Sequence, residues 1–273
     1  MNPSLPSDSS AQMNSPSYLL AVEDKDFLLR DELRAIRFAL EYAKAEVMLR
    51  DWGVRSTIIV FGSARVLSPE EIAALPEPRT DEERLTHERH QKHVHWYEQA
   101  RQFARIVSER GGARAPHDRW RDNVIATGGG PGIMQAANRG AWEVGAPSIG
   151  FNITLPLEQQ PNCFSTPELT FRFHYFAMRK MHLAMRANAL VVFPGGFGTM
   201  DELFEILTLR QTGKAPLVPV VLFDKNYWTR AVNFEAFVEE GMVARADLEL
   251  FDFADTAEEA WDALMRRGLL AHK

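Results

Sequence analysis

The sequence predicts an α/β fold, a Rossmann-like, doubly wound parallel sheet with helices on both faces, preceded by an N-terminal helical extension. From residue 56 onward, short apolar segments typical of buried strands alternate with segments of helical periodicity. Parallel neighbours need such crossover connections. The strand segments are dominated by Val, Ile, Leu and Phe without polar alternation, which is typical of a sheet covered on both faces.

The expected elements follow from these patterns and from their turn residues. The expected strands lie within 56–65, at the start of 123–146, and at 148–155, 169–173, 189–193, 215–223 and 248–253. The expected helices occupy 95–112, the end of 123–146, 174–188, 226–243 and a last segment with Thr256 as its N-cap.

The chain divides into four parts in this interpretation. Residues 1–20 have the composition of a disordered leader and lack the features of a signal peptide. Residues 21–55 form the helical extension, as one long amphipathic helix or two short ones. Residues 56–273 form the Rossmann-like domain, in which 66–92 is a proline-rich, charged surface insertion of unassigned role.

Composition narrows the class of protein. The 273 residues are 45% hydrophobic and 25% charged, which is ordinary for a soluble globular chain. A net charge of −6 argues against a nucleic-acid partner. The single cysteine, Cys163, excludes an intrachain disulfide and a CxxC zinc site, and fits the cytoplasm. No apolar run approaches the roughly 18 residues of a membrane helix. We therefore expect a cytoplasmic protein with no membrane partner, no metal and no cofactor.

Three glycine-rich turns, FGSAR, ATGGGPG and FPGGFGT, each follow an expected strand. In a parallel sheet such turns share the edge where ligands bind. One such turn can be purely structural, because tight turns need positive φ, but three at one edge favour a phosphorylated ligand. The last turn also opens a helix, whose free N–H groups and dipole favour phosphate. The residues expected to bind substrate or phosphate are Gly62, Ser63, Thr127, Gly128, Gly129, Gly130, Gly132, Met134, Lys180, Gly195, Gly196, Phe197, Gly198 and Thr199.

The standard nucleotide motifs are absent from these turns. Neither GGGPG nor GGFG completes the G-x-G-x-x-G fingerprint of a dinucleotide fold. The Gly213-Lys214 pair lacks the upstream glycine of a P-loop and is followed by Ala215. An NAD(P)-linked enzyme is therefore disfavoured.

Glu202 has two interpretations that the sequence leaves open. Thr199-x-x-Glu202 has the spacing of a capping box, in which both side chains satisfy backbone N–H groups. Alternatively, Glu202 lies one turn into a helix whose tip faces the ligand, where a carboxylate could bond sugar hydroxyls or stabilise positive charge.

Arg179 and Lys180 come early in an expected helix, near the same edge of the sheet. A charged pair is usually a solvated helix face. Arg179 has apolar neighbours, however, and an arginine in a crevice suits bidentate contact with phosphate or carboxylate. His174 and His182 have no partner at metal-ligand spacing, so we expect them to be packing or surface residues.

These blocks together resemble the LONELY GUY family of nucleotide-processing proteins. The matching residues are FPGGFGTMDELFEILTLRQTGK, preceded by FAMRK and by GGGPGIMQAANRGA, and the resemblance covers roughly residues 56 to 223. It implies a Rossmann-like fold without dinucleotide chemistry. It also implies a phosphoribohydrolase that cuts a nucleoside 5′-monophosphate, AMP or a cytokinin nucleotide, into free base and ribose 5-phosphate. Arg179 and Glu202 then fall on the family's catalytic pair and Gly195–Thr199 on its phosphate loop.

Two positions depart from the plant-type pattern. Ala177 replaces the histidine of M-H-x-R-K, and Gln135 stands in a block that is richer in glycine in plant members. Both changes resemble a longer bacterial branch. The family's lysine decarboxylase label has no support here, since no lysine is evidently placed to hold pyridoxal phosphate.

The chemistry that this resemblance implies explains acidic residues beside an anion site. Cleavage of an N-glycosidic bond develops oxocarbenium-like charge on the sugar next to the phosphate, and a carboxylate there stabilises that charge and activates water. The competing hypothesis is a sensor that binds a nucleotide without turnover. We also expect a homodimer or higher oligomer, as the resemblance implies.

Overall fold

The computed structural model describes residues 8–155, 160–214 and 218–269. The chain forms two compact units, Met1–Lys44 and Ala45–Lys273. Within the described residues, the second unit holds a parallel sheet of seven strands in the order β4-β3-β2-β1-β5-β6-β7. The strands are β1 Thr57–Phe61, β2 Val124–Thr127, β3 Ser148–Ile153, β4 Thr170–Phe173, β5 Ala187–Val192, β6 Val220–Phe223 and β7 Asp252–Ala254.

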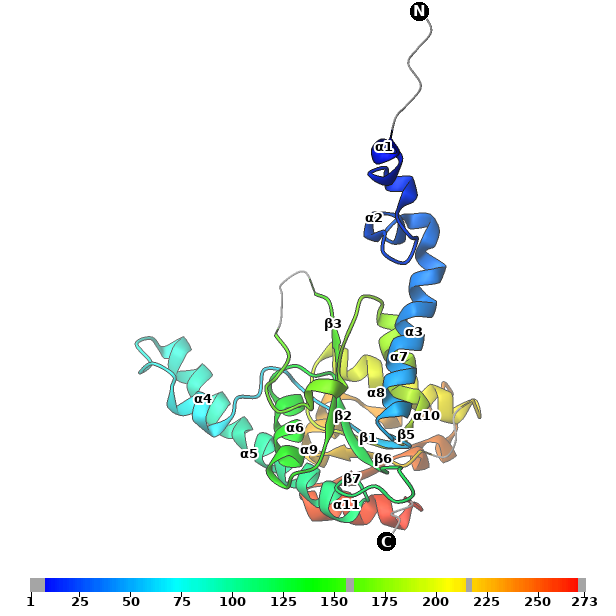
Figure 1. Ribbon diagram of the computed structural model, residues 1–273. Helices are drawn as coiled ribbons and strands as arrows, with labels where there is room; N and C mark the ends of the chain where they lie inside the picture. Colours follow the sequence, from blue (N-terminus) through cyan, green and yellow to red (C-terminus); the bar gives the residue numbers. More distant parts are fainter. Residues whose placement is uncertain (1–7, 156–159, 215–217, 270–273) are drawn as a thin grey trace, which may run out of the picture. The chain divides into compact units, whose positions relative to one another are not determined.

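The sheet is doubly wound, which confirms the expected fold class (Figure 1). The chain proceeds outward from β1 through β2 and β3 to β4, and then returns to β5 on the other side of β1. Because such crossovers are right-handed, this reversal places α5 and α6 on one face of the sheet and α7 and α8 on the other. The carboxyl ends of β1 and β5 therefore border a crevice at the point where the order reverses.

Helices cover strands that are almost entirely apolar. Every residue of β1, β2 and β6 is buried, so the uniform hydrophobicity of these segments reflects burial on both faces. The helices of the second unit are α4 Pro69–Ala73, α5 Asp81–Arg110, α6 Ile133–Glu143, α7 Phe176–Met185, α8 Phe197–Gln211, α9 Lys225–Ala231, α10 Phe234–Glu239 and α11 Ala257–Arg266, with 3-10 turns η3 Pro167–Leu169 and η4 Arg245–Leu250.

The N-terminal unit is helical in its described part. Its elements are α1 Ser10–Met13, η1 Pro16–Tyr18, α2 Lys25–Leu28, η2 Asp31–Leu33 and the start of α3 Arg34–Asp51, which continues into the second unit. The expected disordered leader thus carries short helical turns from residue 10, while 1–7 lie outside the described residues. No helix in the described part of the chain has the length and hydrophobicity to cross a membrane.

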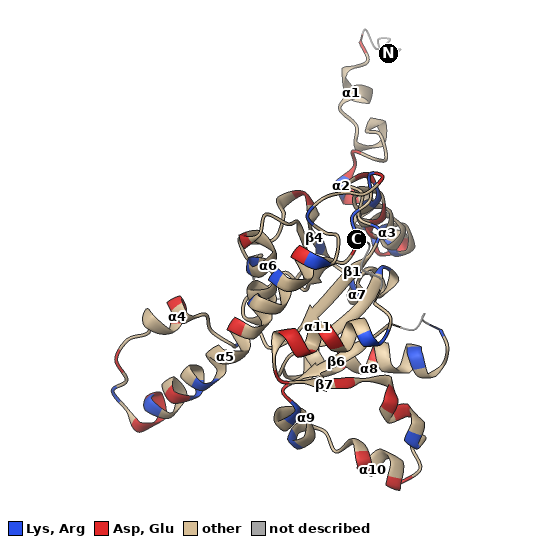
Figure 2. Ribbon diagram, turned by 90° about the horizontal axis from the view of Figure 1, so that it is seen from below, with Lys and Arg blue, Asp and Glu red and all other residues tan. Residues whose placement is uncertain are grey.

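The largest difference from the sequence-based expectation is the start of α5. This helix begins at Asp81 rather than near residue 95, so much of the expected insertion is helical. The Thr80 side chain accepts from Glu83 N, and the Glu83 carboxylate accepts from Thr80 N, at 3.1 Å each. This capping box starts a helix whose first part projects from the sheet together with α4 (Figure 1) and carries both signs of charge (Figure 2).

Two C-terminal expectations were wrong in detail. Residues 248–250 belong to η4 rather than to the last strand, since the Asp247 side chain accepts from Ala244 N and caps that turn. The expected helix at 226–243 is two helices, because the extended backbone of Val232 ends α9 and the Asn233 side chain caps α10 through Ala236 N. The N-cap role of Thr256 is confirmed: its hydroxyl accepts from Glu259 N.

Substitution of Gly132 should destabilise the fold for two reasons, its positive φ and the lack of space for a Cβ. Gly145 has a similar φ but open space around it, so a comparison of the two positions separates these effects. A Cβ at Gly132 would lie 2.4 Å from the Ser63 carbonyl oxygen, whereas one at Gly145 would meet nothing within 4 Å, although both have φ near +70°. Positive φ costs an L-residue about 1–2 kcal/mol. We expect Gly145→Ala to lose about that much free energy of unfolding and Gly132→Ala at least twice as much in urea titrations. Equal losses of unfolding free energy in the two variants would contradict the close packing of the turn after β1 against the turn after β2.

Candidate functional site

A cleft of about 860 Å³ opens at the point where the strand order reverses. Its walls come from the turns after β1, β2 and β5 and from helices α6 to α10. Phe61, Gly62, Ser63, Ala64, Arg65, Gly128, Met134, Arg179, Gly195, Gly196, Phe197, Gly198, Thr199, Met200, Glu202, Phe204, Tyr227, Ala231, Val232 and Phe237 line it.

A buried ion pair lies in this cleft. Arg179 Nη2 of α7 donates to Glu202 Oε1 of α8 at 2.8 Å, and the two side chains are 14% and 5% exposed. Burial raises the pKa of the Glu202 carboxyl, while the charge of Arg179 and its hydrogen bond act in the opposite direction. The Arg179 guanidinium lies over the Phe176 ring, 5.4 Å from its centroid. A carboxyl group whose pKa is raised by burial in a cleft is in the kind of setting where acid–base groups are often found.

The structure excludes one of the two interpretations of Glu202. Helix α8 begins at Phe197, with Gly196 as its N-cap and no side-chain cap. Thr199 therefore lies inside the first turn, and its N–H donates to the Gly196 carbonyl at 3.0 Å. The Glu202 carboxylate bonds to Arg179 instead of reaching back to the backbone. The capping-box interpretation is wrong, because the glycine turn starts the helix three residues earlier than the spacing suggests.

The turn after β5 presents free backbone donors. Within the described residues, the N–H groups of Gly196, Phe197 and Gly198 donate to no protein acceptor. A Cβ on Gly196 or Gly198 would meet nothing within 4 Å, and the Phe197 side chain is 96% exposed. At Gly195, by contrast, a Cβ would fall 2.1 Å from Thr199 Oγ1. This turn is therefore open to a ligand on one side and closely packed on the other.

The turn after β1 is fixed by its two neighbours. Ser63 N donates to the Pro194 carbonyl at 3.0 Å, and Ile133 N donates to the Ser63 carbonyl at 3.2 Å. A Cβ on Gly62 would lie 2.6 Å from the Ile133 side chain. Ser63 thus joins the β5 turn to the beginning of α6, and Gly62 permits the close approach.

The turn after β2 contributes less to the cleft than we expected. Gly128 and Met134 line it, but Thr127, Gly129, Gly130 and Gly132 are not among its lining residues. Thr127 Oγ1 donates to Asn138 Oδ1 at 2.8 Å and accepts from Gly129 N at 2.9 Å. The carbonyls of Gly129 and Gly130 accept from Asn162 N and Nδ2. Thr127, Gly129 and Gly130 therefore stabilise the conformation of this turn and do not line the cleft.

Lys180 also lies outside the cleft. Its Nζ forms ion pairs with Asp201 Oδ2 at 2.7 Å and Glu205 Oε2 at 2.9 Å, on another face of α7 and α8. The two adjacent acids after the glycine turn therefore have different partners: Asp201 forms an ion pair with Lys180, and Glu202 forms one with Arg179. His182 is 1% exposed and packs against the Phe173 ring, as expected of a packing residue.

Sequence reasoning missed several residues of the cleft, chiefly Arg65, Phe204, Tyr227 and Phe237. Arg65 follows the β1 turn directly, so its position in FGSAR could have signalled it. Its N–H donates to Ser63 Oγ at 3.1 Å, and its guanidinium forms no ion pair within the described part of the chain. Tyr227 and the two phenylalanines reach the cleft only through tertiary packing.

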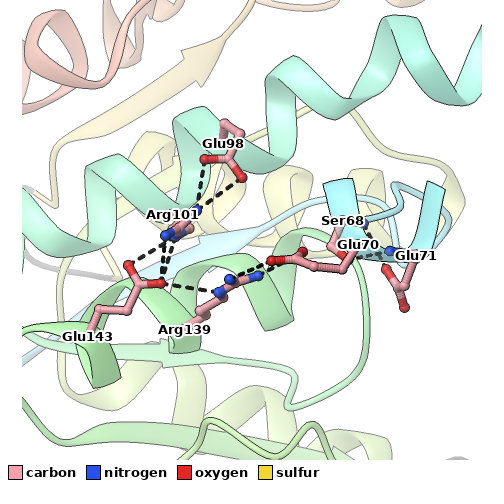
Figure 3. Close-up of polar contacts among 7 residues, drawn as sticks. All are labelled: Ser68, Glu70, Glu71, Glu98, Arg101, Arg139 and Glu143. Atoms are coloured by element: carbon pink, nitrogen blue, oxygen red, sulfur yellow. Dashed lines mark hydrogen bonds and ion pairs between the residues drawn. The ribbon is translucent and has the colours of Figure 1, made fainter. Parts of the chain in front are cut away.

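A chain of ion pairs fixes the segment that follows Arg65 (Figure 3). Ser68 and Glu71 form the capping box of α4. Arg139 of α6 joins Glu70 of that helix at 2.7 Å and Glu143 at 3.1 Å. Glu143 also accepts from Arg101 of α5, which pairs in turn with Glu98. Arg65 therefore lies between two anchored points, the turn at Ser63 and the start of α4.

Comparison with known proteins identifies relatives. A family profile described as possible lysine decarboxylase matches residues 134–264. The probable cytokinin riboside 5′-monophosphate phosphoribohydrolase LOGL3 of Oryza sativa subsp. japonica is 26% identical over 150 residues, 52% of this chain and 67% of that protein. Its counterpart LOG4 from the same source is 28% identical over 140 residues, 50% and 60% of the two chains. LOG3 of Arabidopsis thaliana is 26% identical over 140 residues, 50% and 64%.

The chain is a distant homologue of the plant LONELY GUY, or lysine decarboxylase-like, proteins. The match spans between 60% and 67% of these three plant proteins. Ala177, where plant-type members of the LONELY GUY family usually carry histidine, is exposed on α7 and does not line the cleft.

Two solved structures resemble this chain at 17% identity. TM1055, a structural genomics target, has a TM-score of 0.47 and covers 77% of this chain and 99% of its own. The molybdenum cofactor binding protein of Rippkaea orientalis has a TM-score of 0.45, with 78% and 97% covered.

Proposed function

We propose that this protein hydrolyses the N-glycosidic bond of a nucleoside 5′-monophosphate, AMP or a related cytokinin nucleotide, to a free base and ribose 5-phosphate. The observation that carries the proposal is the buried Arg179–Glu202 pair in a cleft bordered by glycine turns and a helix N-terminus. Membership of a family that includes phosphoribohydrolases supports it.

The substrate's phosphate binds at the start of α8. The free N–H groups of Gly196, Phe197 and Gly198 and the helix dipole provide donors and a positive potential there. Arg65 supplies the full charge, because the other candidate cations are neutralised, Arg179 by Glu202 and Lys180 by two carboxylates. Phosphate binding in this proposal rests on backbone donors and one arginine.

Glu202 acts on the sugar beside that phosphate. As the C1′–N bond breaks, its electrons leave with the base, and positive charge develops on C1′ and the ring oxygen. The carboxylate stabilises this charge and takes a proton from the water that attacks C1′, and the departing base takes up a proton in exchange, so that it leaves neutral and Glu202 is again ionised after turnover. The bond to Arg179 holds the carboxylate in place, so of the two roles open to Arg179 we favour positioning Glu202 over anchoring phosphate.

Two other functions fit less well. A pyridoxal-dependent decarboxylase needs a lysine for the cofactor, and the described residues that line the cleft include none. A non-catalytic nucleotide sensor needs only the glycine turns, and leaves a buried ion pair without a purpose, although burying charges is costly. We retain the sensor as the alternative that an activity assay decides.

We also propose a cytoplasmic homodimer that forms through α7. Phe176, Met181 and Met185 on this helix are 50%, 39% and 47% exposed. Apolar side chains gathered on one helix are a common mark of an interface. Cys163 is free and exposed, which suits a reducing compartment.

The first test is base release. Purified protein should convert AMP to adenine and ribose 5-phosphate, resolved by chromatography, and should act far more slowly on adenosine because adenosine lacks the anchoring phosphate. Arg65→Gln should lose most of this preference for AMP, with Arg245→Gln, an exposed surface arginine of η4, as its control. A protein that binds AMP without releasing base from any nucleoside monophosphate belongs to the sensor class.

Glu202→Gln tests the catalytic carboxylate. Removing a positioned acid–base group should lower kcat about 10² to 10⁴ fold. Asp201→Asn, the adjacent acid that pairs with Lys180 outside the cleft, should retain activity. Because burial raises the pKa of Glu202, the wild-type kcat/KM should fall with decreasing pH above the ordinary glutamate range, as the carboxylate becomes protonated. Normal turnover in Glu202→Gln would remove this residue from the mechanism.

Light scattering at micromolar concentration tests the assembly. We expect a mass of at least two chains, lowered towards one chain by Met181→Glu on α7. Met265→Glu, at a similarly exposed methionine of α11 (40%), should leave the mass unchanged. A monomeric wild-type protein that is fully active would refute the dimer.

A further inference from the structure

The turn that begins α8 is tied to a side chain from a distant part of the sequence. Tyr227 Oη of α9 donates to the Gly195 carbonyl oxygen at 2.6 Å. Tyr227 N in turn donates to Asp224 Oδ1 at 2.9 Å, and Trp96 Nε1 of α5 donates to Asp224 Oδ2 at 2.8 Å. A hydrogen-bonded chain thus runs from α5 through the beginning of α9 to the glycine turn.

This tie fixes the direction of a backbone donor. The Gly195 carbonyl and the Gly196 N–H belong to the same peptide group, which is planar and trans, so they point in opposite directions. When Tyr227 holds the carbonyl, the Gly196 N–H points away from Tyr227. That N–H has no acceptor among the residues described for this chain, and the space beside Gly196 is open.

We propose that Tyr227 is a positioning residue that orients the Gly196 N–H towards the substrate's phosphate, and that Asp224 and Trp96 hold Tyr227 in place. The inference rests on the proposed function in that the anion is a nucleotide's 5′-phosphate. It adds a residue to the site whose contribution acts through the backbone.

The composition of the turn explains why an outside tether is needed. Glycine populates positive and negative φ about equally and loses the most conformational freedom on ordering. A Cβ on Gly196 or Gly198 would meet nothing within 4 Å, so side-chain packing does not confine either residue. A donor array made from such residues binds an anion well only when something rigid holds it.

The tether itself is rigid. Asp224 has φ 70° and ψ 84°, a conformation that costs a non-glycine residue about 1–2 kcal/mol. Three hydrogen bonds hold it there: two that its carboxylate accepts, and one that its N–H donates to the Ala254 carbonyl. The Trp96 ring meets the Tyr227 ring edge to face at 5.7 Å. Burial raises the pKa of the Tyr227 hydroxyl, so it remains a donor at neutral pH.

Tyr227→Phe is the direct test, because it keeps the ring and its contact with Trp96 and deletes only the hydroxyl. We expect KM for AMP and the calorimetric Kd for AMP to rise about tenfold, kcat to stay within about twofold, and kinetics with adenosine to be unchanged. Asp224→Asn keeps the N-cap acceptor and the tolerance of positive φ but cannot accept from Trp96, so it should produce a smaller shift in the same direction. Tyr18→Phe, at an exposed tyrosine of the N-terminal unit (67%), should change nothing.

The two proposals fail separately. Calorimetry reports AMP binding whether or not turnover occurs, so a tenfold weaker Kd in Tyr227→Phe supports the tether even if no base is released. An unchanged Kd and KM in Tyr227→Phe would overturn it. Equal losses for AMP and adenosine would also overturn it, since these would show a general structural role rather than orientation of a phosphate donor. If Tyr227→Phe does not fold, Trp96→Phe gives the same readouts by removing the indole donor.

Discussion

The reversal of strand order between β1 and β5 is the constraint on which the rest of this site depends. Because the chain winds outward from β1 in one direction and from β5 in the other, crossover helices leave for opposite faces and none covers the carboxyl ends of this pair. The turns after both strands therefore meet across an open crevice. Ser63 joins them directly through the Pro194 carbonyl, so the two sides of the cleft are set by one backbone contact.

Charged side chains of α7 and α8 form ion pairs on two faces of these helices, one inside the cleft and one outside it. Asp201 and Glu202 are adjacent in sequence, about 100° apart around α8, and so are Arg179 and Lys180 on α7. The geometry matches one acid to each base, Glu202 with Arg179 inside and Asp201 with Lys180 outside. On the proposed function, an acid beside a phosphate site is tolerated because its charge is already balanced, and the helix N-terminus keeps its positive potential for the ligand.

The sequence predicted the parts whose cause is local. Strands buried on both faces have uniform hydrophobicity, and the turns need glycine where a Cβ would collide, as at Gly62 and Gly195. Other features depend on tertiary contacts that no local pattern reveals. The early start of α5 comes from a cap hidden in a polar stretch at Thr80. Lys180 was expected to bind phosphate because it comes early in its helix, near the carboxyl edge of the sheet, but it lies one position after Arg179 and pairs with Asp201 and Glu205 on another face of the helix.

Phosphate and base recognition, on the proposed function, fall to different kinds of structure. The phosphate donors are backbone groups, whose strength no substitution alters directly, so affinity depends on how the turns are held. Residues distant in sequence restrain these turns. An ion pair between α4 and α6 fixes the segment after Arg65, and the Tyr227 hydroxyl holds the Gly195 carbonyl. Apolar side chains such as Phe204, Val232 and Phe237 form another part of the cleft wall. Substitutions in that wall can change the preferred base without disturbing the phosphate turn, which separates selectivity from the chemistry at Glu202.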